Sequence, residues 1–81
     1  MPKPRTEDGN KNLISSRLVE LREKHGLSQR GLAQKLQLAG YDIDKNVITR
    51  IETNKRYVTD IELRAFAQVL GTTYDFLIDG K

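Results

Sequence analysis

Four polar side chains between residues 45 and 50 have the types and the spacing that read base edges. They are Lys45, Asn46, Thr49 and Arg50. On a helix, successive side chains turn by about 100°, so these four fall within one arc of about 140°. Arg and Lys donate to guanine O6 and N7, Asn pairs with adenine N6 and N7, and Thr donates to a base or touches a thymine methyl.

The other side of the same helix is apolar, which indicates that it packs inward. Ile48 and Ile51 fall there, and the polar arc contains no acidic residue. A solvated surface helix is also polar on its outer side. The residues alone therefore leave two interpretations open, a face that reads nucleic acid and an ordinary exposed face.

A second helix is needed to position this polar arc, and residues 28–40 have the pattern of a helix. Ser28 is an N-cap candidate and Gly40 a terminator, while Gly31 lowers the intrinsic helix propensity by about 1 kcal/mol relative to Ala. Asp44 is the N-cap candidate of the reading helix, which ends in the polar stretch 53–56. The apolar stripe expected on the earlier helix consists of Leu32, Ala33, Leu36, Leu38 and Ala39.

Three more helices are predicted around this pair. The first helix starts at Leu13 and ends at residues 24–26. The fourth helix starts at the capping box of Thr59 and Glu62 and ends at Gly71. Thr73 caps a short fifth helix. No segment alternates with period two, so we expect an all-α fold of five short helices. The apolar positions of these helices are Leu13 or Ile14, Leu18, Leu21, Leu63, Phe66, Ala67, Leu70, Tyr74, Phe76, Leu77 and Ile78.

Length and composition favour one small intracellular domain. The chain has 81 residues, a net charge of +3 and no Cys, which excludes disulfides and thiolate metal sites and fits a reducing, cytoplasmic location. No apolar run approaches the 18–20 residues or so of a membrane span. A lone histidine, His25, offers no metal site and is expected to be solvated. We therefore expect no cofactor and no metal.

The first twelve residues are expected to form a flexible tail before a domain that covers residues 13–81. They contain two Pro, a Gly and five charged side chains, and they cannot bury apolar area. Lys3 and Arg5 could form a short basic arm along a DNA backbone, but an unstructured terminus is the favoured interpretation.

Short motifs in residues 13–80 resemble the phage repressor and Cro-type helix-turn-helix family. They occur in order and with nearly the family's spacing. The fragments that carry the resemblance are Ser15-Ser16-Arg17-Leu18, Leu21-Arg22, Leu27-Ser28-Gln29, Leu32-Ala33, Leu36, Ile48-Thr49-Arg50-Ile51-Glu52, Lys55-Arg56, Leu63, Phe66-Ala67, Leu70-Gly71 and Tyr74-Asp75-Phe76-Leu77.

The resemblance implies a compact five-helix repressor-like domain and a sequence-specific DNA-binding transcriptional regulator, with repression as the expected mode. The third helix would be the recognition helix that reads the major groove. The resemblance implies base contacts from Lys45, Asn46 and Arg50, with Thr49 beside them. It implies phosphate contacts from the helix start at Ser28 and from Gln29, Lys55 and Arg56.

The resemblance also implies a buried ion pair between Arg22 of the first helix and Glu52 of the recognition helix. Arg22 lies on the inward stripe of its helix, and Glu52 borders the apolar side of the reading helix. The alternative is two solvated charges. A buried pair would tie the first helix to the recognition helix.

The connector before the recognition helix departs from the family pattern. Gln37 stands where the family has a Gly, and residues 37–43 form a longer connection. Either the second helix continues or the loop bulges. In both cases Ile43 can enter the core, and we expect Tyr41 to cover the core edge, with a phosphate contact as the alternative.

The resemblance implies double-stranded DNA as the partner and a homodimer on it, with no membrane or small-molecule ligand. Candidate interface residues are Tyr57, Val58, Tyr74 and Leu77, and the alternative for each is an ordinary core edge. An antitoxin or adaptor-type protein-interaction module on the same fold is the second functional hypothesis. An enzyme is not expected, because the chain has no paired carboxylates in a cleft, no phosphate-cradling Gly loop and no His dyad.

Overall fold

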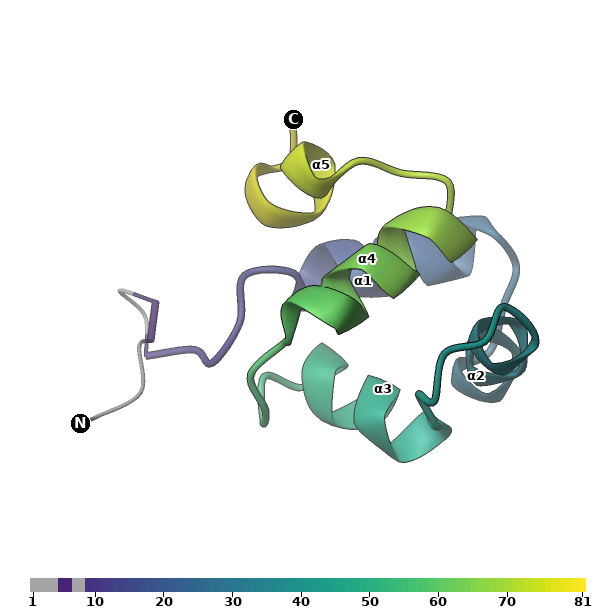
Figure 1. Ribbon diagram of the computed structural model, residues 1–81. Coiled ribbons are helices and arrows are strands. Elements are labelled where there is room, and N and C mark those ends of the chain that lie inside the picture. The colour runs from purple at the N-terminus through teal and green to yellow at the C-terminus, as the bar shows by residue number, and fades with distance from the viewer. Residues whose placement is uncertain (1–4, 7–8) are drawn as a thin grey trace.

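The computed structural model describes residues 5–6 and 9–81. This part of the chain contains five helices and no strand (Figure 1). The all-α prediction is confirmed. None of these helices is long and apolar enough to cross a membrane. In order, the helices are α1 (Ser15–Lys24), α2 (Gln29–Leu38), α3 (Lys45–Glu52), α4 (Asp60–Val69) and α5 (Tyr74–Asp79).

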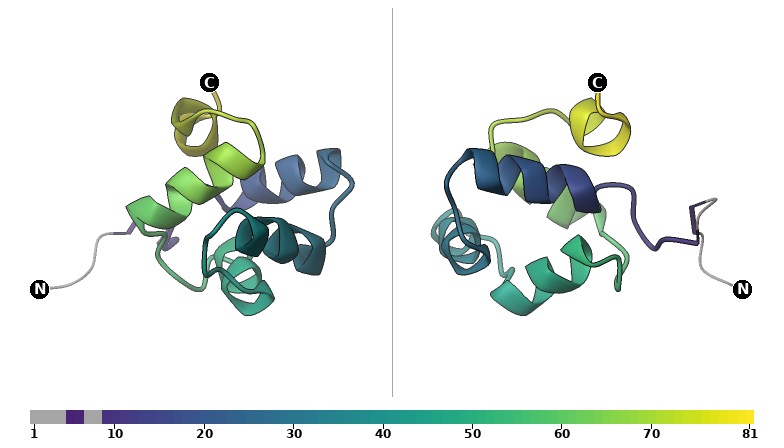
Figure 2. Two further views of the ribbon diagram at one scale, coloured as in Figure 1. Left: turned by 45° about the vertical axis from the view of Figure 1, so that its right-hand side comes forward. Right: turned by 180° about the vertical axis from the view of Figure 1, so that it is seen from behind.

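The helices surround one core, and α3 lies at its edge. α3 packs against α1 and α2, α5 packs against α1 and α4, and the two views of Figure 2 show α3 and α5 at opposite ends of the molecule. Ile48 and Ile51 of α3 are fully buried. The other side of α3 therefore faces solvent. The remaining large and fully buried side chains are Leu18, Leu32, Leu36, Phe66, Leu70 and Leu77.

Local capping rules place the starts of four helices correctly. The side chains of Ser28, Asp44, Thr59 and Thr73 accept hydrogen bonds from backbone amides of α2, α3, α4 and α5 respectively. Glu62 completes the capping box by accepting from the amide of Thr59 at 3.0 Å. Each such cap contributes about 1 kcal/mol, so these short helices start at defined residues.

The first helix starts two residues later than the pattern predicts. Leu13 is 54% exposed, whereas Ile14 is 3% exposed and belongs to the core. The Oδ1 atom of Asn12 accepts from the amides of Ile14 and Ser15 at 3.1 and 2.9 Å. The N-cap residue Ile14 has no side-chain cap, so the side chain that binds the first amides here comes from a residue expected in the flexible tail.

The buried stripe of α2 ends at Leu36, so the prediction that Leu38 and Ala39 extend it is wrong. Leu38 is 89% exposed and Ala39 is exposed as well. Two residues along a helix correspond to a rotation of about 200°, which turns Leu38 away from the side that Leu36 buries. On α4, similarly, Leu63 is only partly buried and Ala65 is fully buried.

Most of the extra length between α2 and α3 lies in the loop. α2 ends one residue beyond Gln37, and Gly40 then turns the chain at a φ of 95°. Tyr41 packs against the core edge as expected, and its hydroxyl donates to Gln68 Oε1. Ile43 is 3% exposed and anchors the loop directly before the cap of α3.

The segment before α1 is attached to the domain where the structure describes it. The amide of Thr6 donates to the carbonyl of Asn10 at 3.0 Å, and the Lys11 ammonium lies 5.9 Å from the centre of the Tyr57 ring. The rest of the expected tail, residues 1–4 and 7–8 with Lys3, lies outside the described residues.

Candidate nucleic-acid interface

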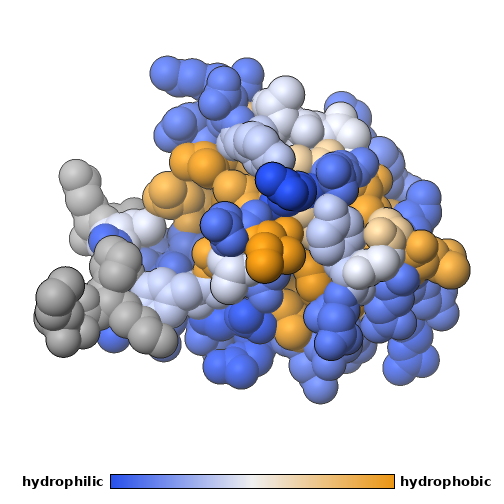
Figure 3. Space-filling model, in the orientation of Figure 1, coloured by the Kyte–Doolittle hydropathy of each residue, from blue (hydrophilic) through white to orange (hydrophobic). Residues whose placement is uncertain are grey.

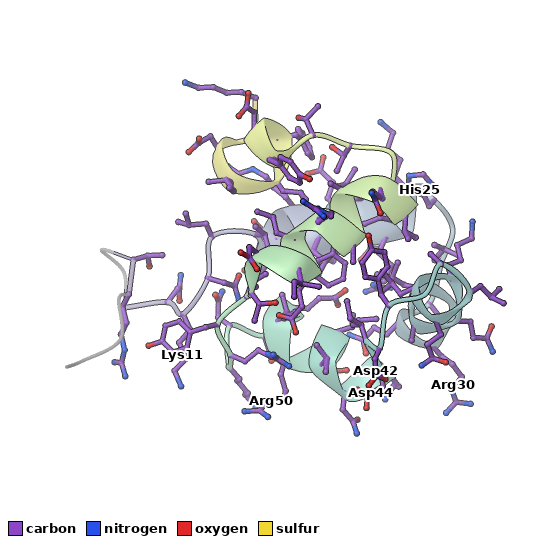
Figure 4. The ribbon with its side chains drawn as sticks, in the orientation of Figure 1. Lys11, His25, Arg30, Asp42, Asp44 and Arg50 are labelled. Carbon is purple, nitrogen blue, oxygen red and sulfur yellow. The ribbon has the colours of Figure 1, made fainter. Side chains whose placement is uncertain are left out.

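Three of the four residues expected to contact bases are exposed on the outer side of α3. They are Lys45, Asn46 and Arg50. Figure 4 shows Arg50 at the lower edge of the molecule, pointing away from the core. Among the described residues neither Lys45 nor Arg50 forms an ion pair. This face therefore carries two uncompensated positive charges and an amide.

Thr49, the fourth residue, is partly buried between α2 and α3. Its hydroxyl lies 2.7 Å from Gln29 Oε1 and 3.0 Å from the carbonyl oxygen of Lys45. The single hydroxyl hydrogen is therefore already used inside the protein. In this structure Thr49 holds two helices together and does not present a donor to solvent.

Gln29, at the start of α2, has one N–H engaged and one remaining. Its Nε2 donates to Glu52 Oε1 at 2.8 Å, and an amide nitrogen carries two hydrogens. The first backbone amides of α2 have no partner within the helix. The helix start at Ser28 and the second N–H of Gln29 can therefore serve an anion.

Arg22 and Glu52 form the ion pair that the resemblance implies. Arg22 Nε donates to Glu52 Oε2 at 2.7 Å and Nη2 donates to Oε1 at 3.1 Å, a two-point contact. The side chains are 14% and 4% exposed. Hydrogen bonding to Glu52 raises the pKa of Arg22 above its ordinary value, which keeps the guanidinium charged.

Glu52 joins three helices, because its Oε1 accepts from both Arg22 and Gln29. Arg22 also donates from Nη1 to the carbonyl of Leu27 in the connection between α1 and α2, at 2.9 Å. The orientation of α3 against α1 and α2 is thus set by directed polar contacts as well as by the core. Residue patterns alone do not reveal the Gln29 link, since its partners are 20 and 23 residues away.

Of the two cations expected to contact phosphate after α3, only Lys55 is unengaged. Lys55 is exposed, and no ion pair involves it within the described ranges. Arg56 instead pairs with Glu62 at 2.9 Å and donates to the carbonyl of Tyr57 at 3.2 Å. A phosphate contact by Arg56 would require this pair to open.

The four candidate dimer residues have different surroundings. Leu77 is 0% exposed and belongs to the core, so it cannot contact a partner and that expectation is wrong. Tyr74 is 47% exposed, and Tyr57 and Val58 line an open cavity of about 490 Å³. Figure 3 shows apolar side chains at the surface over α4 and beside α5.

His25 is exposed at the end of α1, but it is not simply solvated. Its Nε2 lies 3.0 Å from the carbonyl oxygen of Leu70, just beyond α4. In the described part of the chain, no three His, Asp or Glu side chains gather as metal ligands would.

The comparisons with known proteins agree with this geometry. A family model described as HTH_3, helix-turn-helix, matches residues 18–77. A crystal structure of an HTH_3 family transcriptional regulator from Vibrio cholerae is similar, with a TM-score of 0.69 and 27% identity. The match covers 85% of this chain and 37% of that one, so the chain spans little more than a third of that regulator. No curated protein matches the sequence.

Proposed function

The chain belongs to the HTH_3 helix-turn-helix family, and we propose that it acts as a transcriptional repressor that reads operator DNA with α3. The family match and the solved relative both indicate a DNA-binding regulator and not an enzyme. The observation that carries the proposal is the exposed face of Lys45, Asn46 and Arg50, on a helix held from behind by Glu52.

Base reading by this face takes place in the major groove. The groove is about 12 Å wide and admits one α-helix. Recognition helices contact base edges mainly with residues near their N-termini, where Lys45 and Asn46 lie on α3. Arg50 lies on the same exposed side of α3, and its guanidinium suits a two-point contact to guanine. Thr49 contributes to reading through its methyl group, since its hydroxyl is engaged by Gln29.

Phosphate contacts beside the reading helix fix the register of the protein on DNA. The start of α2 behind Ser28 and the second N–H of Gln29 provide one set of donors. The loop after α3 provides Lys55, with Arg56 as a further contact if its pair with Glu62 opens. Such contacts set affinity and orientation but carry no sequence information.

Replacing Lys55 by alanine should weaken binding to all duplexes by a similar factor and reduce the salt slope of log K by about 1. Fluorescence titrations at several salt concentrations measure the slope. Arg64→Ala removes an exposed cation from α4, outside the interface, and serves as the control. A slope identical to that of the wild type would show that Lys55 contacts no phosphate.

Binding as a two-fold dimer completes the proposal. One helix reads too few base pairs for high affinity, and proteins of this type bind half-sites about 34–36 Å apart. Tyr57 and Val58, which line the cavity described above, and the exposed Tyr74 are the proposed contacts. Occupancy of the operator then blocks transcription without any cofactor or small-molecule ligand, in the cytoplasm.

Selection of bound sites from a pool of random duplexes tests the function. The expected product is an inverted repeat with half-site centres about 10 base pairs apart. Inserting about 5 base pairs between the half-sites should abolish the affinity gained from the second half-site. Enriched sites that tolerate the insertion would contradict binding as a two-fold dimer. Failure to enrich any sequence would contradict DNA reading and favour the antitoxin or adaptor hypothesis.

A further inference from the structure

Asn12 connects the start of α1 to the end of the recognition helix. It lies outside residues 18–77, which the family model matches, and at the boundary where the sequence predicts a tail. Its Nδ2 donates to the carbonyl oxygens of Ile51 and Arg56, both at 3.1 Å. Its Oδ1 accepts from the amides of Ile14 and Ser15.

These four contacts use the whole hydrogen-bonding capacity of one amide. The first N–H groups of α1 and the last C=O groups of α3 lack partners within their own helices. The amide oxygen of Asn12 faces the positive end of α1, and the amide nitrogen faces the negative end of α3. An aspartate could serve α1 equally well but has no hydrogens for α3.

A second asparagine strengthens the same junction. Asn54 follows α3 with a φ of 60°, in the left-handed region that asparagine tolerates better than most residues. Its Nδ2 donates to Ser15 Oγ at 2.7 Å. The loop after α3 is therefore attached to the start of α1 at two points, by Asn12 from one side and by Asn54 from the other.

We propose that Asn12 is a positioning residue for sequence reading, which fixes the C-terminal end of α3 so that Arg50 meets its base at the correct angle. This inference rests on the proposed DNA-reading function. The contacts of Glu52 hold α3 to the far end of α1, at Arg22, and to the start of α2. Asn12 attaches the same end of α3, at the carbonyl of Ile51, to the near end of α1, so this end of the recognition helix is held from both ends of α1.

A tilt of α3 would affect specific and non-specific binding differently. Hydrogen bonds to base edges weaken steeply when their angles deviate. Phosphate attraction is long-ranged and tolerates small displacements. Loss of the Asn12 donors should therefore reduce the preference for the right sequence more than the general affinity for DNA.

The test compares Asn12→Asp with the matched variant Asn10→Asp. The first keeps the acceptor for α1 and removes both donors, to the carbonyl of Ile51 at the end of α3 and to that of Arg56 in the loop after it. The second adds the same charge two residues away, where only the backbone of Asn10 takes part in the hydrogen bonds described. The probes are a duplex selected by the wild type and a scrambled duplex of the same composition, at a temperature where circular dichroism shows each protein folded.

Asn12→Asp should lower the ratio of specific to non-specific affinity by about tenfold, roughly the effect of one mismatched base pair. Asn10→Asp should leave the ratio at the wild-type value. An equal ratio in all three proteins, or an equal fall in both variants, would overturn the inference. A purely structural role would lower the melting temperature and leave the ratio of the folded protein unchanged.

Two further outcomes are also decisive. If Asn12→Asp does not fold, Asn12→Ala removes both donors without adding a charge, and an unchanged ratio in that variant overturns the inference. If the wild type itself binds both duplexes equally, the proposed function fails and this inference fails with it. If the wild type discriminates and Asn12→Asp discriminates equally well, only the role of Asn12 is refuted.

Discussion

Replacing Arg22 by alanine is expected to lower the free energy of unfolding by about 3–5 kcal/mol, the usual effect of removing one partner of a buried ion pair. The side chain of Glu52 is 4% exposed. Without Arg22 its carboxylate would keep the hydrogen bond from Gln29 but would lose its ion-pair partner. Small domains are stable by only about 5–15 kcal/mol, so the variant should be close to unfolding.

Urea denaturation followed by circular dichroism measures this loss. Arg30→Ala, which removes an exposed guanidinium from α2, is the control and should change stability by less than about 0.5 kcal/mol. Replacing Arg22 and Glu52 together by apolar residues of similar size should restore much of the stability, since no charge is left buried. An unchanged midpoint for Arg22→Ala would show that the pair contributes nothing to the fold.

Replacing Arg50 by alanine is expected to reduce specific affinity by about 1–3 kcal/mol and to relax the preference at one position of the operator. Arg50 is exposed, points away from the core and is unpaired among the described residues. No internal contact is lost, so the stability of the domain should not change. Titration with the selected duplex and with duplexes that each vary one base pair measures both effects.

The comparison with Lys55→Ala distinguishes the two classes of contact. Lys55→Ala should weaken every duplex by a similar factor, whereas Arg50→Ala should weaken the selected duplex most. An equal loss for Arg50→Ala on every sequence would mean that this residue contacts phosphate and does not read bases.

Elements governed by local rules could be predicted from the sequence. The N-caps of α2 to α5 depend on a side chain and an amide three residues apart, and all four are correct. The side of α3 that packs inward follows from the spacing of Ile48 and Ile51. The five helices and their order are therefore accessible without coordinates.

Features that depend on distant partners could not be predicted. Asn12 looks like part of a polar tail because its contacts on Ile51 and Arg56 are 39 and 44 residues away. Leu38 and Leu77 are both leucines near a helix end, yet one is 89% and the other 0% exposed. Neighbouring helices, and not local composition, decide which of them is buried.

The residues of the candidate site also fall into those that local patterns predict and those that depend on distant partners. The exposed face of Lys45, Asn46 and Arg50 follows from helical periodicity. The pair of Arg22 and Glu52 is implied by the resemblance to repressors. The engagement of Thr49 by Gln29 and of Arg56 by Glu62 appears only in the packed structure.

Binding to operators in which single guanines are replaced by 7-deazaguanine tests major-groove reading by α3 most directly, because this base lacks only the N7 acceptor. At one guanine of each half-site, the replacement should weaken the wild type but leave the affinity of Arg50→Ala unchanged, since the contact is already lost. If every replacement weakens the wild type and Arg50→Ala by the same factor, Arg50 does not read guanine in the major groove and the account is contradicted.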